Sequence, residues 1–201
     1  MKEWDQDIFH LHDDQPQPGR GSLLVAKPTV DDFFFKKSLV LIVDPDEGEG
    51  AMGVVVNHYT GYNLRDIMPD IETVEEIPLF LGGPVGPQML FYMHTLGPDI
   101  IPEAISVGDG VWFGGDFDAI KRYVELGAQV EGRIKFIVGY SGWGKGQIAS
   151  EINRHDWAVL NDSDSGLVMG AGDDDVWREA VTCFGNRYRL WLNLPGDAGW
   201  N

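Results

Sequence analysis

Glycine and proline interrupt the apolar segments of this chain at short intervals, and this feature constrains the fold more than any other. The 201 residues include 26 glycines and 11 prolines, so glycine makes up about 13% of the chain, well above its average usage. The longest apolar runs are consequently short, at Leu39–Val43, Val54–Val56 and Leu79–Leu81. Short apolar runs separated by tight turns are typical of strands and argue against a bundle of long helices.

The apolar runs predict most of the secondary structure. Ser38–Asp44 is rich in β-branched residues and too short for a helix, and Ala51–Asn57 follows it after a turn at Asp44–Gly50. Two such runs joined by a glycine-containing loop are expected to form a hairpin. Further strands are predicted at Ser22–Lys27, Pro78–Gly82, Met89–His94, Ala104–Val107, Gly110–Gly114, Ile134–Gly139, Trp157–Leu160 and Arg189–Leu192, with a turn at Gly82–Pro87.

Three helices are expected among these strands. Asp116 is the predicted N-cap of one that ends near Gly127, because apolar residues recur at helical spacing after it. By the same pattern Asp173 is the predicted N-cap of another, which ends at Gly185. A third is predicted at Gly146–Arg154. Adjacent strands with interspersed helices predict an α+β fold rather than a doubly wound parallel sheet.

Composition divides the chain into two parts and limits its partners. Residues 1–20 are interpreted as an acidic N-terminal appendage that closes in a linker at Gln15–Gly19, and residues 21–201 as a single domain. The whole chain has 15 basic and 32 acidic residues, a net charge of −17. Because DNA and RNA binding draws on Lys and Arg contacts with phosphates, direct nucleic-acid binding is not expected.

Cysteine usage and the N-terminus predict a cytoplasmic location. Cys183 is the single cysteine, so no disulfide forms within the chain and a reducing compartment is favoured. The N-terminus has no basic region followed by an apolar run, and we therefore expect no signal peptide. The apolar runs are far shorter than the roughly 20 residues that cross a bilayer. We expect no membrane contact.

Four segments, together with three residues that follow the last of them, resemble the AlgH/YqgE family of small bacterial proteins. They are Gly21–Pro28, Gly50–Asn57, Pro78–Val85 and Gly139–Trp143, followed by Gly146, Gln147 and Glu151. The resemblance implies a mixed, largely antiparallel, barrel-like sheet flanked by helices. Family members are labelled transcriptional regulators, but the family has no agreed biochemical activity or catalytic residues, so the resemblance transfers none to this chain.

The segment Gly139–Gly146 has two chemical interpretations and one structural interpretation. It matches the first seven positions of a phosphate-binding loop, G-x-x-x-x-G-K, although Gly146 replaces the hydroxyl residue that ligates magnesium. It also resembles a nucleophile elbow around Ser141, in which Trp143 replaces the last glycine. The structural interpretation is that the glycines let the backbone turn while Tyr140 and Trp143 pack. The first two readings would make the protein a cryptic nucleotide- or phosphate-binding protein or a hydrolase.

A ligand pocket is predicted from residues at strand ends, because loops on rigid strands commonly carry binding sites. The predicted lining residues are Asn57, His94, Tyr140, Ser141 and Trp143. The competing interpretation is that they only fix the turns. The sequence shows no convergent catalytic set and no metal-ligand spacing, so no catalytic residue, metal or cofactor is predicted. We expect a non-enzymatic regulatory or adaptor protein that contacts a protein or small-molecule partner.

Overall fold

The computed structural model describes residues 15–73, 75–161, 164–170, 172 and 174–194. The strands are β1 (Leu23–Ala26), β2 (Leu39–Asp44), β3 (Ala51–Val55), β4 (Tyr59–Asn63), β5 (Pro78–Leu81), β6 (Val85–His94), β7 (Ile105–Gly108), β8 (Val111–Phe113), β9 (Ile134–Trp143) and β10 (Trp157–Leu160). The helices are α2 (Leu64–Ile67), α3 (Phe117–Glu125), α4 (Gln147–Asn153), α5 (Ser165–Met169), α6 (Asp174–Cys183) and the 3-10 helix η1 (Asn186–Asn193). Within these ranges no helix has the length and apolar character that crossing a membrane requires.

The strands form one sheet in the order β10-β1-β2-β3-β9-β6-β8-β7, with β5 beside β9 and β4 beside β5. The described pairs are antiparallel except for β5 and β9, which are parallel. This confirms the predicted α+β class and the largely antiparallel sheet. In the described part of the chain the main path of the sheet ends at β10 and at β7, so the sheet is open and does not close into a barrel.

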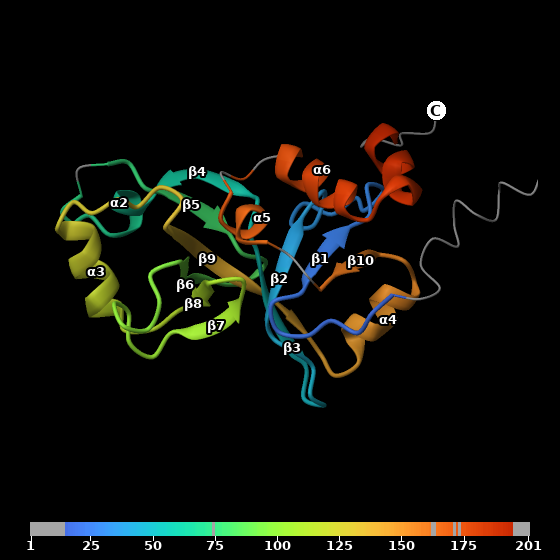
Figure 1. Ribbon diagram of the computed structural model, residues 1–201, viewed down its shortest axis with the longest axis horizontal. Helices are drawn as coiled ribbons and strands as arrows, with labels where there is room; N and C mark the ends of the chain where they lie inside the picture. Colours follow the sequence, from blue (N-terminus) through green and yellow to red (C-terminus); the bar gives the residue numbers. More distant parts are fainter. Residues whose placement is uncertain (1–14, 74, 162–163, 171, 173, 195–201) are drawn as a thin grey trace, which may run out of the picture.

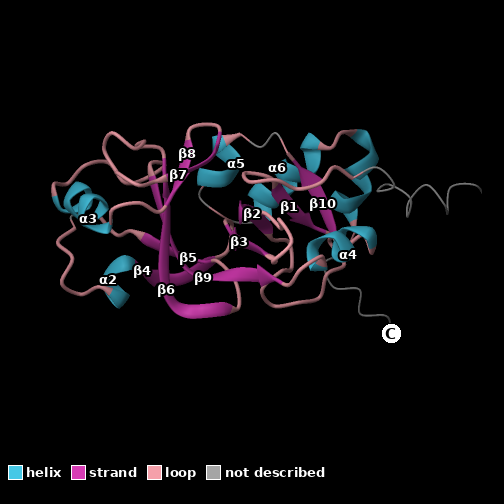
Figure 2. Cartoon of the chain, turned by 90° about the horizontal axis from the view of Figure 1, so that it is seen from below, coloured by secondary structure: helices cyan, strands magenta, loops and turns pink. Residues whose placement is uncertain are grey.

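Strand β9 links two halves of the molecule. Its first residues pair with β5 and β6, where Phe136 lies opposite Leu79 and Tyr92. Its last residues pair with β3, where Trp143 lies opposite Ala51. Figure 1 shows α2 and α3 at one end of the molecule and α4 and α6 at the other, and Figure 2 shows β9 running between them. We call these ends the α3 half and the α6 half.

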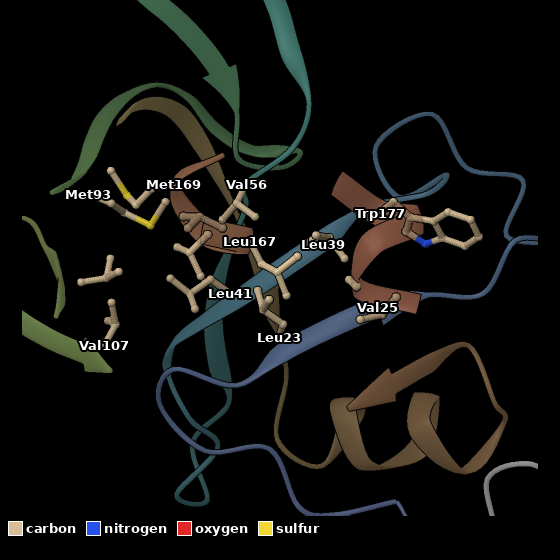
Figure 3. Close-up of a cluster of buried hydrophobic side chains, with 14 of the residues drawn as sticks. Leu23, Val25, Leu39, Leu41, Val56, Met93, Val107, Leu167, Met169 and Trp177 are labelled. Atoms are coloured by element: carbon tan, nitrogen blue, oxygen red, sulfur yellow. The ribbon is translucent and has the colours of Figure 1, made fainter. Parts of the chain in front are cut away.

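Strands β1 and β2 are buried on both faces, which explains their uninterrupted apolar sequences. Successive side chains of a strand point to opposite faces. Leu23 and Leu41 therefore pack with residues of α5 and α6 (Figure 3). Leu24 and Val40 belong to a separate cluster that includes residues of α4. Helices thus cover both faces of this part of the sheet.

The α3 half has its own core, and α3 begins as predicted. The Asp116 carboxylate accepts hydrogen bonds from the backbone nitrogens of Asp118 and Ala119, which are unpaired donors at the first turn of a helix. Ile120 and Val124 are buried on the inner face of α3. They pack in a cluster with Leu64, Ile71, Ile77, Leu79, Tyr92, Leu96, Ile101, Ala119, Val130, Ile134 and Phe136.

Gly82 lies at a close approach of three strands. A Cβ atom at this position would lie 2.3 Å from the carbonyl oxygen of Gly139 and 2.6 Å from Cγ2 of Ile137, so a side chain has no room there. The Gly82 carbonyl oxygen accepts hydrogen bonds from the backbone nitrogen of Val55, at 2.9 Å, and from Oγ of Ser141, at 3.0 Å. The glycine pair at the end of β5 therefore lets β3, β5 and β9 meet.

Several sequence predictions are confirmed in detail. β2 and β3 form the expected antiparallel hairpin, with Val40 opposite Val55. α4 occupies most of the predicted helix at Gly146–Arg154, and α6 ends before Gly185, which has the left-handed φ of 79° that favours glycine after a helix. The predicted N-cap of α6, Asp173, lies outside the described residues.

Other predictions about strand ends are wrong. β9 was expected to end at Gly139, but it continues to Trp143 because residues 141–143 pair with β3. β6 begins at Val85, inside the predicted turn at Gly82–Pro87, and Val85 pairs with Tyr140 of β9. Both strands are longer than predicted because distant partners continue the ladder through glycine-rich sequence.

The predicted final strand at Arg189–Leu192 is also wrong, because these residues belong to η1. Tyr188 and Trp191 are three residues apart, which places them on one side of a 3-10 helix. Both are buried, and their ring centroids are 5.0 Å apart. Packing of these rings against the core therefore selects a helix where the local sequence favoured a strand.

The last residues of the predicted appendage contact the domain. Oε1 of Gln15 accepts a hydrogen bond from the backbone nitrogen of Val159 in β10 at 2.7 Å, and its Nε2 donates to the Tyr188 hydroxyl at 2.9 Å. Gln15 thus joins the outer edge of β10 to η1. Residues 1–14 of the appendage lie outside the described residues.

Candidate functional site

A cavity of about 430 Å³ opens in the α3 half, where the segment before β5 meets the segment between α3 and β9. The end of α5 completes its wall. The lining residues are Glu75, Glu76, Ile77, Pro78, Phe80, Val130, Glu131, Gly132, Ile134, Lys135, Met169 and Gly170. Its volume is in the range of small-ligand and side-chain pockets.

A second cavity of about 120 Å³ adjoins the first, because Glu75, Ile77 and Val130 line both. Its remaining lining residues are Thr73, Val124, Gly127 and Ala128. The two cavities together form a furrow between Thr73 and residues 75–78 on one side and residues 127–132 on the other. We call this furrow the acidic groove.

The floor of the acidic groove is apolar. Ile77, Phe80, Val130 and Ile134 each have no more than 6% of their surface exposed. Phe80 and Ile134 are held by β5 and β9, which pair with each other and so fix the floor. A ligand that covered this floor would remove from water the small apolar surface that these side chains still expose, which is a modest contribution to binding.

The rim of the groove is negatively charged. Glu75, Glu76 and Glu131 are exposed and come from the two segments that flank the groove. Among the described lining residues, Lys135 is the only one with a basic side chain. The rim therefore presents three carboxylates above an apolar floor.

The Lys135 side chain is directed into the structure and is used there. Its Nζ donates hydrogen bonds to the carbonyl oxygens of Val56 at 2.7 Å, Val168 at 2.8 Å and Gly170 at 2.8 Å. It also lies 4.5 Å from the centroid of the Phe80 ring, a cation–π contact. Because an ammonium group has three donors, these three acceptors use all of them. Lys135 therefore joins β9 to the end of β3 and to α5.

Burial lowers the pKa of Lys135 from 10.5 to about 7. The side chain is 4% exposed, and removing a charge from water disfavours the protonated form. A lowered pKa is common among catalytic lysines, but those present a free amine to a substrate. Here the amine faces three backbone carbonyls, and the geometry indicates a structural anchor beneath the groove.

The segment Gly139–Gly146 differs from the loop that the sequence suggested. Residues 139–143 belong to β9, so their backbone groups lie in a strand. Beyond the strand, the backbone nitrogen of Gly144 donates to Oε1 of Gln147 at 2.9 Å, and that of Gly146 donates to Oδ2 of Asp46 at 2.5 Å. Protein oxygens thus occupy amides that a phosphate would contact in a phosphate-binding loop.

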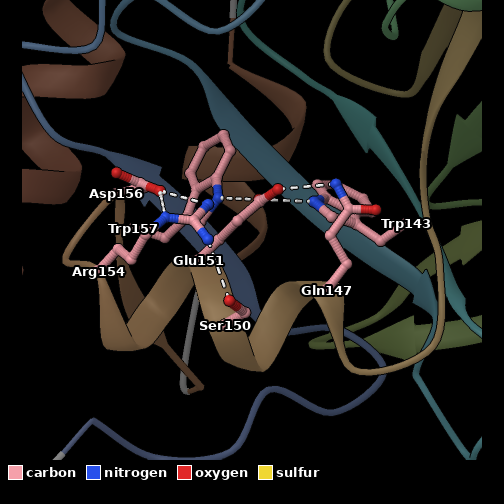
Figure 4. Close-up of polar contacts among 7 residues, drawn as sticks. All are labelled: Trp143, Gln147, Ser150, Glu151, Arg154, Asp156 and Trp157. Carbon is pink, nitrogen blue, oxygen red and sulfur yellow. Dashed lines mark hydrogen bonds and ion pairs between the residues drawn. The ribbon is translucent and has the colours of Figure 1, made fainter.

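Glu151 connects this segment to α4 and β10 (Figure 4). Its Oε2 accepts hydrogen bonds from Nε1 of Trp143 at 2.9 Å and from Nε1 of Trp157 at 2.8 Å. Its Oε1 accepts from Nε2 of Gln147 at 2.8 Å. One carboxylate therefore satisfies both indole donors, and the tryptophan, glutamine and glutamate of the family-like segment form a single structural network.

Asn57 and Ser141, two of the five predicted pocket residues, make internal hydrogen bonds. Asn57 Oδ1 accepts from the backbone nitrogen of Leu39 at 2.8 Å, and its Nδ2 donates to the carbonyl oxygen of Lys37 at 2.9 Å. Ser141 is 1% exposed, and its Oγ donates to Gly82 as described above. Both residues fix segments that lead into or out of strands.

The structure does not gather all five predicted residues in one place. His94 lies opposite Ile134 at the start of β9, whereas Tyr140 is six residues further along that strand, about 20 Å away at strand spacing. Tyr140 packs against Phe91, with ring centroids 6.0 Å apart, and Trp143 belongs to the core beside α4. A ligand-binding role for these five residues stays a prediction.

The His94 ring is fully buried and engaged on both nitrogens. Nε2 lies 3.1 Å from the carbonyl oxygen of Gly114, and Nδ1 lies 3.3 Å from the backbone nitrogen of Leu96. A carbonyl can only accept and a backbone amide can only donate, so the proton is on Nε2 and the ring is neutral. Burial lowers the pKa of His94, which agrees with this assignment. In the described residues no group of three or more His, Cys, Asp or Glu is placed to hold a metal ion.

The sequence of the described fold matches one known family. The model of the family described as AlgH-like, DUF179, matches residues 23–189, which include every strand and most of the helices. The chain belongs to the AlgH-like family. This confirms the resemblance seen in the four sequence segments.

Relatives of this AlgH-like chain include two UPF0301 proteins and two solved structures. A UPF0301 protein of Parabacteroides distasonis is 38% identical over 192 residues and covers 96% of both chains, and UPF0301 protein BF2109 of Bacteroides fragilis is 37% identical, covering 94% of both. Protein DIP2367 from Corynebacterium diphtheriae has a TM-score of 0.73 at 19% identity, covering 89% of this chain and 93% of its own. The AlgH protein from Pseudomonas aeruginosa has a TM-score of 0.65 at 23% identity, covering 92% and 100%. Both structures show the same fold.

Sequence reasoning missed the acidic groove of this AlgH-like chain. Lys135 is the one charged residue in the apolar segment Ile134–Val138, which was predicted to be a strand. A lysine in such a segment is rarely buried unless its ammonium group is paired, so its position could have indicated a buried, hydrogen-bonded side chain. The rim glutamates come from segments more than 50 residues apart in sequence, between Glu76 and Glu131. No local pattern indicates that such segments meet.

Proposed function

We propose that this AlgH-like protein is a non-enzymatic regulatory or adaptor protein that binds a protein or small-ligand partner in the acidic groove. The observation that carries the proposal is the groove itself. Its apolar floor lies beneath three carboxylates, Glu75, Glu76 and Glu131, and the one cation among its described lining residues, Lys135, is hydrogen-bonded to backbone. Such a combination of apolar surface and convergent polar groups is typical of binding sites.

The hydrogen bonds of the reactive side chains support binding over catalysis. A nucleophile or base must present a free lone pair or proton to a substrate. Ser141 donates to a backbone carbonyl, His94 is neutral with both nitrogens engaged, and Lys135 donates to three carbonyls. Each of these side chains stabilises the fold in the state seen here.

Charge supports a partner other than nucleic acid. The net charge of −17 repels phosphate backbones, so a role in transcription would run through proteins or small ligands. The single cysteine, Cys183, supports a cytoplasmic location. We therefore propose a cytoplasmic regulator that acts by contact with another protein or with a metabolite.

Affinity capture with charge-reversed variants tests the proposal. The groove variant is Glu75→Lys/Glu76→Lys, and the matched control is Glu47→Lys/Glu49→Lys in the hairpin loop between β2 and β3. All four glutamates are exposed, and both double variants change the net charge equally. A stoichiometric partner or co-purifying ligand retained by wild type and control, and lost from the groove variant, is the expected result.

Two results would redirect the proposal. Loss of a partner on Tyr140→Phe with retention by the groove variant would move the site to the residues predicted from sequence. Turnover of an ester or phosphate substrate that disappears on Ser141→Ala would make the protein an enzyme. Thermal shift assays with nucleotides give an independent check, because a ligand at 100 times its Kd adds about 2.7 kcal/mol of stability.

A further inference from the structure

The length of the acidic groove suits a partner that is extended. The two adjoining cavities of about 430 and 120 Å³ lie side by side along one furrow and share part of their lining. Thr73 also lines a third hollow of about 600 Å³, whose lining includes Arg65 of α2. A row of hollows accepts successive side chains of an extended segment, a recurrent mode of peptide recognition.

Carboxylates flank the furrow along its whole length. Asp70, Glu72 and Glu125 line the third hollow, in addition to the rim glutamates of the first, and Glu125 pairs with Lys121 at 3.6 Å. The cation in the third hollow, Arg65, donates through Nη2 to the carbonyl oxygen of Thr73. Lys135 and Arg65, the cations among the described lining residues of the furrow, are therefore held by backbone carbonyls, whereas the carboxylates Glu72, Glu75 and Glu76 are exposed. These exposed carboxylates favour a partner with positive charge.

The apolar floor selects among positively charged partners. Lys and Arg side chains combine an apolar stem with a charged head, so a stem can cover Ile77 and Val130 while its head meets the rim. A metal ion would gain nothing from the apolar floor. A peptide backbone also carries amide donors and carbonyl acceptors, whereas a polyamine carries donors alone.

We propose that the acidic groove binds an extended, lysine- or arginine-containing segment of a partner protein. This inference rests on the proposed function and adds the chemical class of the partner. Basic side chains enter the adjoining hollows, and their heads pair with Glu75, Glu76 and Glu131. Because exposed charges are screened by salt, binding weakens as ionic strength rises.

Fluorescence anisotropy with synthetic peptides tests the inference on the full chain. The probes are a labelled peptide of alternating lysine and valine and a peptide of the same length with glutamate in place of lysine. The lysine peptide is expected to bind wild type and the Glu47→Lys/Glu49→Lys control alike. Reversal at Glu75→Lys/Glu76→Lys is expected to weaken it at least about tenfold and to let the glutamate peptide bind.

The matched control separates the groove from the general attraction of an acidic protein for cations, since both variants have the same net charge. NMR shifts of the bound state should cluster at Ile77, Val130 and Gly132. Equal binding by the two variants, or shifts spread over the surface, would overturn the inference.

Binding of spermine at these residues without binding of the peptide would also overturn it and assign the groove to a polyamine. If affinity capture shows a groove partner whose contact segment lacks lysine and arginine, the proposed function stands and this inference fails.

Discussion

The carboxylate of Asp46 accepts a hydrogen bond from the backbone nitrogen of Gly146, a contact between the β2–β3 loop and the start of α4. Asp46 Oδ1 accepts two more, from the backbone nitrogens of Gly48 at 2.9 Å and Gly50 at 3.1 Å. The loop of one hairpin thus supplies the anion for the glycine-rich turn that follows β9. The Asp46 carboxylate thus engages a backbone amide that a phosphate would contact in a phosphate-binding loop.

Asp46 should titrate below its ordinary pKa of 3.8. The hydrogen bond from Gly146, then that from Gly48, lowers the pKa of this carboxyl by stabilising its charged form. Because the folded pKa is the lower one, the contact stabilises the protein above pH 3.8 and is lost as the pH falls through the folded value. A carbon-detected NMR titration measures this pKa. The Gly146 amide resonance should follow the same curve, and an independent curve would contradict the contact.

Lys135 should make stability rise with pH in the alkaline range. Its pKa is about 7 when folded and 10.5 in the unfolded reference, so between these values the unfolded chain binds more protons at this site. The free energy of unfolding then rises with pH, by at most about 1.4 kcal/mol per pH unit. Denaturant titrations from pH 7 to 10 should show this slope in wild type and a smaller one in Lys135→Met. Equal slopes in wild type and Lys135→Met would refute the prediction.

Glu151→Ala should destabilise the protein by about 2–4 kcal/mol. The change leaves Nε1 of Trp143 and of Trp157 without an acceptor, and each buried unsatisfied donor costs about 1–3 kcal/mol. Urea denaturation followed by tryptophan fluorescence measures the loss. Glu151→Gln keeps an acceptor oxygen and should lose less. A loss below about 0.5 kcal/mol in Glu151→Ala would mean that the network contributes little.

Gly82→Ala should destabilise the fold although the added group is one methyl. The Cβ would lie 2.3 Å from the carbonyl oxygen of Gly139, and backbone on both sides must move to admit it. Overpacking of this kind costs about 1–3 kcal/mol. Gly144→Ala is the control, because its nearest neighbour would be Oε1 of Gln147 at 3.8 Å. Equal midpoints in chemical denaturation for the two variants would show that the strands adjust freely.

The elements that could be predicted from the sequence are those whose cap, apolar spacing and turn residues all lie within the element or next to it. Asp116 supplies the cap of α3 and apolar spacing supplies its buried face, so the helix could be predicted from about ten residues. The β2–β3 hairpin follows in the same way from two β-branched runs and the turn between them. The resemblance to the AlgH-like family was also visible in short segments, one of which contains Gly82, where a side chain has no room.

Tertiary structure alone decided how long β9 is and where the acidic groove lies. Tyr140, Ser141 and Trp143 are in a strand because β3 and β6 pair with them, and those partners are 50 or more residues away. The ammonium of Lys135 likewise meets carbonyls of Val56, Val168 and Gly170, which are 33 or more residues away in sequence. A local pattern reports the period of apolar residues along the chain, whereas a cavity or a buried charge depends on which distant segments meet.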